Sequence, residues 1–150
     1  MNGQVFTPRD PDFGPRIEAS FARQAFMGHL GVKLAHVAPG EVDLEVAFHE
    51  RLTQQHGYFH AGVTATIADS AAGYAALSLF APGTGILTTE FKINLLAPAR
   101  GQRLVARGRA IKAGRTLTVC RADVAAVRDG AETLIATGLF TLMQVEGLED

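Results

Sequence analysis

Apolar and polar residues alternate with a period of two over much of the chain, as expected for β-strands with one buried face. The alternation continues longest in four segments of the second half, residues 85–98, 102–114, 115–130 and 132–145. Asp129-Gly130, at the end of the third segment, is a strong signal for a two-residue hairpin turn. The pattern therefore predicts four long strands that follow one another as a meander.

Two shorter alternating segments, residues 32–38 and 42–48, flank a Pro39-Gly40 turn. They predict a hairpin with one face in water. In its first strand the alternation places four residues on one face, namely Val32, Leu34, His36 and Ala38.

Between this hairpin and the long strands lies the longest helical candidate, residues 54–76, continuing to about Phe80, where Pro82-Gly83 stops it. Residues 16–27 predict a short N-terminal helix. A helix as apolar as the central one needs cover on most sides, which a strongly curved antiparallel sheet wrapped around it provides. We therefore expect an α+β arrangement with the outline of a hotdog fold.

The chain of 150 residues is expected to form a single domain, residues 16–150, after a flexible N-terminal arm, residues 1–15, that carries three prolines. No stretch approaches the roughly 20 apolar residues of a membrane span, and the N-terminal residues lack the apolar run of a secretory signal. The lone Cys120 excludes an intrachain disulfide framework. These features predict a cytoplasmic protein without a membrane partner.

The charge balance is close to neutral, with a formal net charge of −1 at pH 7. A net charge this small does not indicate that the protein binds nucleic acid or an acidic membrane. An anionic ligand would need a local basic patch, and we expect no nucleic-acid partner.

One acid, Asp69, lies in the middle of the apolar helical segment. Taking an unpaired carboxylate out of water is costly, so this group should be paired, protonated or chemically used. At 100° per residue it shares one stripe with small residues, namely Gly62, Ala65, Thr66, Ala72, Gly73 and Ala76. Such a stripe leaves room for a second backbone or a ligand, and the cost of about 1 kcal/mol for a mid-helix glycine favours a close contact at Gly73. The alternative is an Asp that reaches solvent at the sheet edge or bonds a neighbouring backbone group.

The histidines do not pair with Asp69 within one helix. His60 lies nine residues earlier, which corresponds to about 13.5 Å of rise and nearly opposite faces. Either His60 has a structural role, or the partner of Asp69 comes from another subunit. His56 and His60 have the i, i+4 spacing of metal ligands, but Gly57 between them favours a loop and no third ligand is placed, so no metal site is expected.

The segments "HGYFHAGVTATIADSAAGYAA" and "TTEFKINLLAPA" resemble the hotdog acyl-CoA thioesterases of the phenylacetic acid degradation protein type. That family combines a His-Gly-Gly at the helix entry, an Asp nine residues after the His, and a later strand with an acid and a closing Pro-Ala. The matching residues here are His60, Gly62, Asp69, Glu90, Pro98 and Ala99. The resemblance covers about residues 20–145 and implies the hotdog fold.

Two positions depart from the family pattern. Ala61 stands at the middle glycine, and Gln54 stands where many members carry an Asn six residues before the His. The family uses the backbone N–H of the middle position, which Ala61 can still supply. Gln54 keeps the amide group but extends its reach by one methylene.

The resemblance implies an enzyme that hydrolyses acyl or aryl-acyl thioesters of coenzyme A, without another cofactor, at a site between two subunits. In this hypothesis the Ala61 N–H polarises the thioester carbonyl. Asp69 of the partner chain attacks the carbonyl or deprotonates a water. Gln54 orients the nucleophile or water, Thr88 supplies a hydroxyl near the Asp, and His60 fixes the loop by hydrogen bonds.

The substrate is expected to lie along the small-residue stripe, next to Gly62, Thr66 and Gly73. The phosphates of coenzyme A need cations, and Arg115 in the turn "AGRT" is the candidate we favour among the strand arginines and lysines. The site requires a homodimer, and dimers of this fold commonly pair into tetramers. The identity of the acyl group stays open.

Two other functions are alternatives. A hotdog hydratase or dehydratase usually pairs a His with an acid in one site, and nothing in this sequence matches that arrangement. A non-catalytic acyl-CoA or lipid-binding module would gain little from a buried acid, so Asp69 argues against it.

Overall fold

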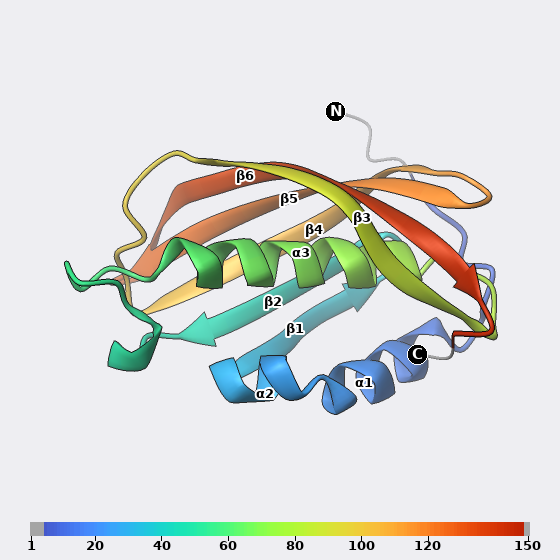
Figure 1. The fold of residues 1–150 in the computed structure, drawn as a ribbon, viewed down its shortest axis with the longest axis horizontal. Helices are drawn as coiled ribbons and strands as arrows, with labels where there is room; N and C mark the ends of the chain where they lie inside the picture. The colour runs from blue at the N-terminus through green and yellow to red at the C-terminus, as the bar shows by residue number, and fades with distance from the viewer. Residues whose placement is uncertain (1–4, 149–150) are drawn as a thin grey trace.

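In the computed structural model, which describes residues 5–148, six strands form one antiparallel sheet that curves around a long helix (Figure 1). The helices are α1 (Phe13–Arg23), α2 (Ala25–Leu30) and α3 (Ala61–Leu77), with a 3-10 turn at Glu50–Leu52. The strands are β1 (Val32–Ala38), β2 (Glu41–Ala47), β3 (Thr84–Leu95), β4 (Arg103–Ala113), β5 (Leu117–Arg128) and β6 (Ala131–Glu146). Their order is β1-β2-β4-β5-β6-β3, with β3 at one edge. This arrangement confirms the predicted hotdog fold.

The central helix is covered by the sheet along its C-terminal half, where all residues from 71 to 77 are buried. Gly108 on β4 permits the close approach, because a Cβ there would lie 2.2 Å from the carbonyl oxygen of Ala71. Ala72 and Ala76, which share the stripe with Asp69, are fully buried. At Ala72 the second backbone for which the stripe leaves room is that of β4, because the curved sheet contacts this side of the helix as well.

The helix α3 begins at Ala61, later than the predicted start at Gln54. Gly57 has a φ of 79°, which an α-helix cannot contain, and a bridge between Thr53 and Phe59 closes the preceding residues into a loop. The longest element is therefore shorter than expected, and the residues before it form its entrance.

The predicted hairpins and the four long strands are confirmed, with two errors. Asp129 and Gly130 both have positive φ, 52° and 82°, as a type I′ turn requires. The strands are not one meander, because β3 pairs with β6 at the edge of the sheet while β4 pairs with β2. The second error lies in β1. A bulge between Leu34 and His36 shifts the register, so that His36 pairs with Asp43. His36 and Ala38 therefore do not share the face of Val32 and Leu34, because one extra residue moves every later side chain to the other face.

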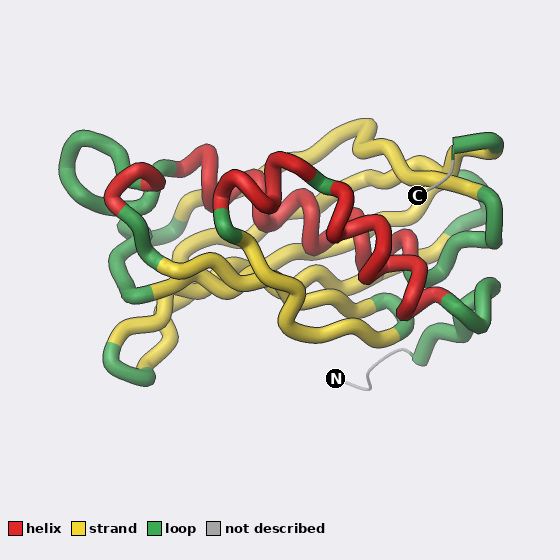
Figure 2. The backbone as a smooth tube through the Cα atoms, turned by 90° about the horizontal axis from the view of Figure 1, so that it is seen from below, coloured by secondary structure: helices red, strands yellow, loops and turns green. Residues whose placement is uncertain are grey.

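The short N-terminal helix begins at Phe13, earlier than the predicted Arg16, and is divided at Gln24 into α1 and α2. Gln24 is extended, with φ −73° and ψ 94°. Figure 2 shows α1 and α2 running alongside α3. Buried Asp10 pairs with Arg16 at 3.0 Å, and Arg16 donates to the Thr84 carbonyl oxygen at 2.6 Å. Residues 1–4 of the predicted arm, and residues 149–150, lie outside the described residues.

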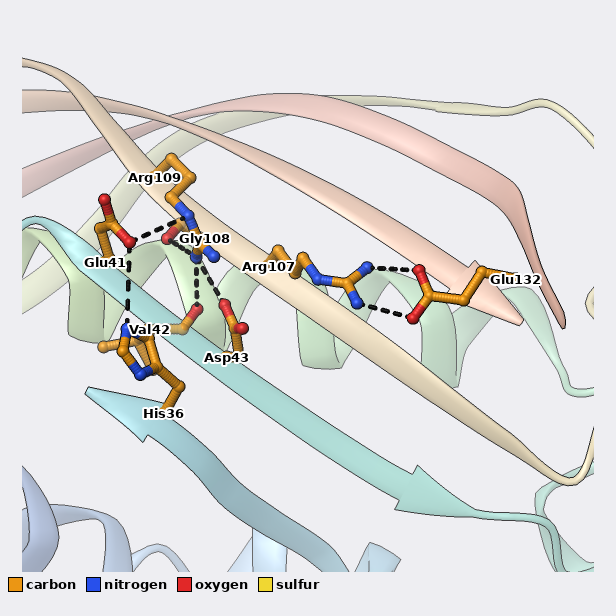
Figure 3. Close-up of polar contacts among 8 residues, drawn as sticks. All are labelled: His36, Glu41, Val42, Asp43, Arg107, Gly108, Arg109 and Glu132. Atoms are coloured by element: carbon orange, nitrogen blue, oxygen red, sulfur yellow. Dashed lines mark hydrogen bonds and ion pairs between the residues drawn. The ribbon is translucent and has the colours of Figure 1, made fainter. Parts of the chain in front are cut away.

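Cross-strand ion pairs cover the outer face of the sheet (Figure 3). Arg109 contacts Asp43 at 2.5 Å and Glu41 at 3.5 Å. Arg107 makes a bidentate contact with Glu132, at 2.7 and 2.9 Å, and this hydrogen bonding lowers the pKa of Glu132. Because each of these cations already faces a carboxylate, this cluster is a poor binding site for an anion.

Candidate active site

The carboxylate of Asp69 is half-buried on α3 and is held by a neighbouring strand. Thr88 on β3 donates its hydroxyl hydrogen to Asp69 Oδ1 at 2.9 Å. The next threonine, Thr89, instead donates to the Thr141 carbonyl oxygen. Burial raises the pKa of the Asp69 carboxyl, and the hydrogen bond from Thr88 partly opposes that shift. A carboxylate whose pKa is raised in this way is a better base or nucleophile than an exposed one.

Two adjoining cavities border Asp69, and they share Gln24, Asp69 and Ser70 in their linings. The larger, about 380 Å³, extends toward the N-terminal end of α3 and is completed by Phe26, Met27, Ala65, Thr66 and Phe91. The smaller, about 150 Å³, extends toward the C-terminal end and is completed by Gly73, Tyr74, Ile86 and Thr88. The small residues around the carboxylate therefore border open space, as the helical stripe predicted for its N-terminal half.

The entrance of α3 is capped by His60. Its Nδ1 accepts a hydrogen bond from the Gly62 N–H at 2.8 Å, so this nitrogen carries no proton in the capped state. A Cβ on Gly62 would lie 2.9 Å from the same nitrogen, which explains why a glycine stands at this position. Among the described residues we find no acceptor for the Ala61 N–H. That donor lies at the positive end of the helix dipole.

Gln54 and Ala61 line a cavity of about 470 Å³ together with Tyr58, Phe59, Thr64, residues 95–99 and Ile135. The Gln54 Oε1 accepts from the His56 N–H within the loop. Asp69 does not line this cavity, and its separation from Ala61 along one helix is roughly 12 Å. The structure thus brings Gln54 to Ala61 and Thr88 to Asp69, but it does not bring these two pairs together in one chain.

The remaining predicted residues are distributed along the same helix face and one distant turn. Thr66 lines the larger cavity beside Asp69 and also a cavity of about 340 Å³ that includes His60 and Gly62. A Cβ on Gly73 would meet Ile86 Cδ1 at 3.8 Å, an ordinary contact, so no other backbone of the described chain makes the close contact expected there. Arg115 lies in the turn between β4 and β5.

Several residues of these cavities were not identified from the sequence. Gln24 reaches α3 because the N-terminal helix is interrupted there, and no local pattern signals that interruption. Arg128 was not identified either, and it lines a cavity of about 480 Å³ with Arg100, which was among the cations considered for coenzyme A. The Arg100 guanidinium lies 5.0 Å from the centre of the Tyr58 ring, which connects this basic cavity to the one that contains Ala61.

Other chemistry has little support. Within the described residues no group of three or more His, Cys, Asp or Glu side chains could hold a metal ion. Cys120 is buried, and burial raises its pKa to about 12, so its thiolate is not formed near neutral pH. None of the described helices is both long and apolar enough to cross a membrane.

Comparison with known proteins agrees with the fold. Residues 56–132 match the Thioesterase superfamily. A thioesterase family protein from Silicibacter pomeroyi has a crystal structure that matches with a TM-score of 0.89 at 47% identity, over 90% of this chain and 99% of that chain. Human acyl-coenzyme A thioesterase 13 is 31% identical over 111 residues, 73% of this chain and 77% of the relative. The Escherichia coli PaaI protein, from the phenylacetic acid degradation operon, shares the fold, with a TM-score of 0.80 at 18% identity over 91% of this chain and 95% of that chain.

Proposed function

This chain belongs to the thioesterase superfamily, and on that basis we propose that it is an acyl-CoA thioesterase that releases a free acid and coenzyme A. The observation that carries the proposal is the position of the Asp69 carboxylate, which accepts a hydrogen bond from Thr88 and borders two cavities. Burial raises the pKa of this group. A module that only binds acyl-CoA would gain nothing from a desolvated carboxylate, because that charge repels the phosphates of the ligand.

Either of two routes breaks the thioester bond at this site. In the first, a carboxylate oxygen of Asp69 attacks the carbonyl carbon, the carbon–sulfur bond breaks, and water hydrolyses the resulting anhydride. In the second, Asp69 takes a proton from water, the hydroxide adds to the carbonyl carbon, and the proton then passes to the leaving thiolate. In both routes the Ala61 N–H and the helix dipole stabilise the negative charge on the carbonyl oxygen.

We propose a homodimer in which Ala61 of one chain faces Asp69 of the other, because the two groups are roughly 12 Å apart on a single helix. The edge strand β3 is the natural contact, since β6 is its one neighbour within the described sheet. Large apolar side chains remain exposed at this edge, namely Phe91 at 48%, Leu95 at 57% and Leu96 at 52%. An apolar sheet edge of this kind favours pairing with another chain. Two such dimers would form the tetramer expected of this fold.

The other roles follow from position. We propose that Gln54 orients the attacking group, that Gly62 and Thr66 border the bound substrate, and that His60 holds the helix entrance rather than transferring protons. For the coenzyme A phosphates we retain Arg115 and Arg100 and add Arg128, which shares a cavity with Arg100. The assignment to the phenylacetic acid degradation type and the cytoplasmic location are part of the same proposal.

The deciding experiment replaces Asp69 by Asn and by Ala and measures thiol release from acyl-CoA substrates of graded length. We expect kcat to fall by about 10²- to 10⁴-fold in both variants, the range for loss of a general base. Thermal unfolding at wild-type temperature would show that the fold is intact. Wild-type turnover by both variants would contradict the proposal. A wild-type protein that binds these substrates without turning any of them over would instead be a binding module.

A further inference from the structure

We propose that Gln24, Gly73 and Tyr74 form an end pocket that receives the far end of the acyl group and selects compact acyl groups with a hydrogen-bonding atom there. This inference rests on the proposed thioesterase function of Asp69. It concerns which thioester is accepted. The helical stripe placed Gly73 next to the substrate, but neither the resemblance nor the comparisons assign a role to Gln24 or Tyr74, or a selective role to Gly73.

The first support is the position and size of the end pocket. It is the cavity of about 150 Å³ that lies past Asp69 toward the C-terminal end of α3, with Ser70, Ile86 and Thr88 completing its lining. An acyl group whose carbonyl carbon lies at Asp69 can extend into this space. An engineered protein cavity of about this volume holds one benzene molecule. The end pocket therefore fits one ring or a short chain and excludes a long fatty acyl group.

The second support is the polar wall of the end pocket. Tyr74 is buried, at 3% exposure, and its hydroxyl lies 3.1 Å from Ser20 Oγ and 3.0 Å from Gln24 Nε2. The interruption between α1 and α2 is what brings the Gln24 amide to this point. Among the described residues no donor contacts Gln24 Oε1, so this oxygen is available to accept from a hydroxyl or amide of the substrate.

The third support is the glycine in the middle of α3. Alanine favours a helix over glycine, so Gly73 needs another reason for its presence. Packing does not supply it, because an added Cβ would meet the nearest described atom, Ile86 Cδ1, at an ordinary 3.8 Å. Gly73 has no positive φ, so the backbone does not require glycine either. What the missing Cβ does provide is volume in the end pocket.

Gly73→Ala tests the size of the end pocket without threatening the fold. We expect kcat/KM for benzoyl-CoA to fall about 10-fold or more. The value of kcat/KM for acetyl-CoA should change less than about twofold, because the acetyl group does not reach the pocket. The matched control is Gly14→Ala in α1, where an added Cβ meets no atom within 4 Å. It should leave the preference between the two substrates unchanged. Neither variant should unfold at a lower temperature than the wild type.

Gln24→Leu tests the polarity of the end pocket at similar side-chain volume. We expect the ratio of kcat/KM for 3- or 4-hydroxybenzoyl-CoA to that for benzoyl-CoA to fall about 10-fold, because the leucine offers no partner to the hydroxyl. Tyr74→Phe should change the same ratio in the same direction. A change in thermal stability alone cannot alter this ratio.

Uniform effects would overturn the inference. If Gly73→Ala and Gln24→Leu both lower kcat/KM equally for every substrate, or lower it for none, the cavity holds only water. A wild-type preference for dodecanoyl-CoA over the aromatic substrates would also reject a small end pocket that selects compact acyl groups. Failure of the proposed function is a different result, because Asp69→Asn would then leave turnover of all substrates intact.

Discussion

At Asp69 two opposing influences set the charge of the carboxyl group. Burial favours the neutral acid and raises the pKa, whereas the hydrogen bond from Thr88 favours the carboxylate and lowers it. Burial is the larger influence, so the group loses its proton at a higher pH than an exposed Asp. The proposed reaction uses the carboxylate, and activity should therefore rise with pH through this pKa.

Replacing Thr88 by Val removes the opposing influence. We expect the pKa of Asp69 to rise further, so the acid limb of the kcat/KM profile moves to higher pH and the loss of activity is greatest in acid. Thr88→Ser keeps the hydroxyl and is the matched control, with its acid limb close to that of the wild type. An unchanged acid limb in Thr88→Val, measured as kcat/KM across pH, would show that this hydrogen bond does not tune Asp69.

The helix α3 contributes its N-terminus as well as its side chains. His60 is extended, with φ −64° and ψ 139°, and its ring occupies the Gly62 N–H. The Ala61 N–H is left for the substrate oxygen in the proposed reaction. The roles of these two N–H groups depend on which residue begins the helix, and the loop at residues 54–60 therefore matters to the site.

Ala61→Pro removes this one donor with little effect on the helix. Proline is well tolerated at the first helical position, and the residue before it must be extended, as His60 already is. We expect kcat to fall about 10²- to 10³-fold, the range for loss of one oxyanion donor, while the unfolding temperature is retained. Ala61→Ser keeps the N–H and should retain activity. Full activity in Ala61→Pro would rule out this N–H as the donor.

At the scale of the whole molecule, the single chain separates the groups that the chemistry needs together. Gln54 and Ala61 border one cavity, and Asp69 and Thr88 border others. The exposed apolar side chains on edge strand β3 provide a contact for a second copy that would join them. A symmetric dimer would create two equivalent sites, each with parts from both chains.

Mixing two inactive variants tests this arrangement. In a dimer of Asp69→Asn with Ala61→Pro, one site carries both defects and the other carries none. If subunits mix freely, half of the dimers are hybrids with one intact site, and about a quarter of wild-type activity returns. Each variant alone, treated identically, is the control. No recovery despite hybrids detected by mass spectrometry would place the whole site in one chain.

Local patterns predicted the regular elements and part of the site. The period of two identified the long strands, Asp129-Gly130 identified a hairpin, and the helical stripe placed Asp69 among small residues that now border cavities. These features depend on neighbours a few positions away along the chain, which the sequence displays directly. The proximity of Thr88 to Asp69 came from the resemblance to a family, because nineteen positions separate the two.

Tertiary structure alone decided which faces are open and which distant residues meet. Ala72 and Ala76 share the periodicity of Asp69, yet the curved sheet buries them. Gln24 and Tyr74 lie fifty positions apart, and they meet because α1 and α2 pack beside α3. A hydrophobic pattern states that a face needs cover, but which element covers it, and where a cavity remains, depends on the packing of all the elements together.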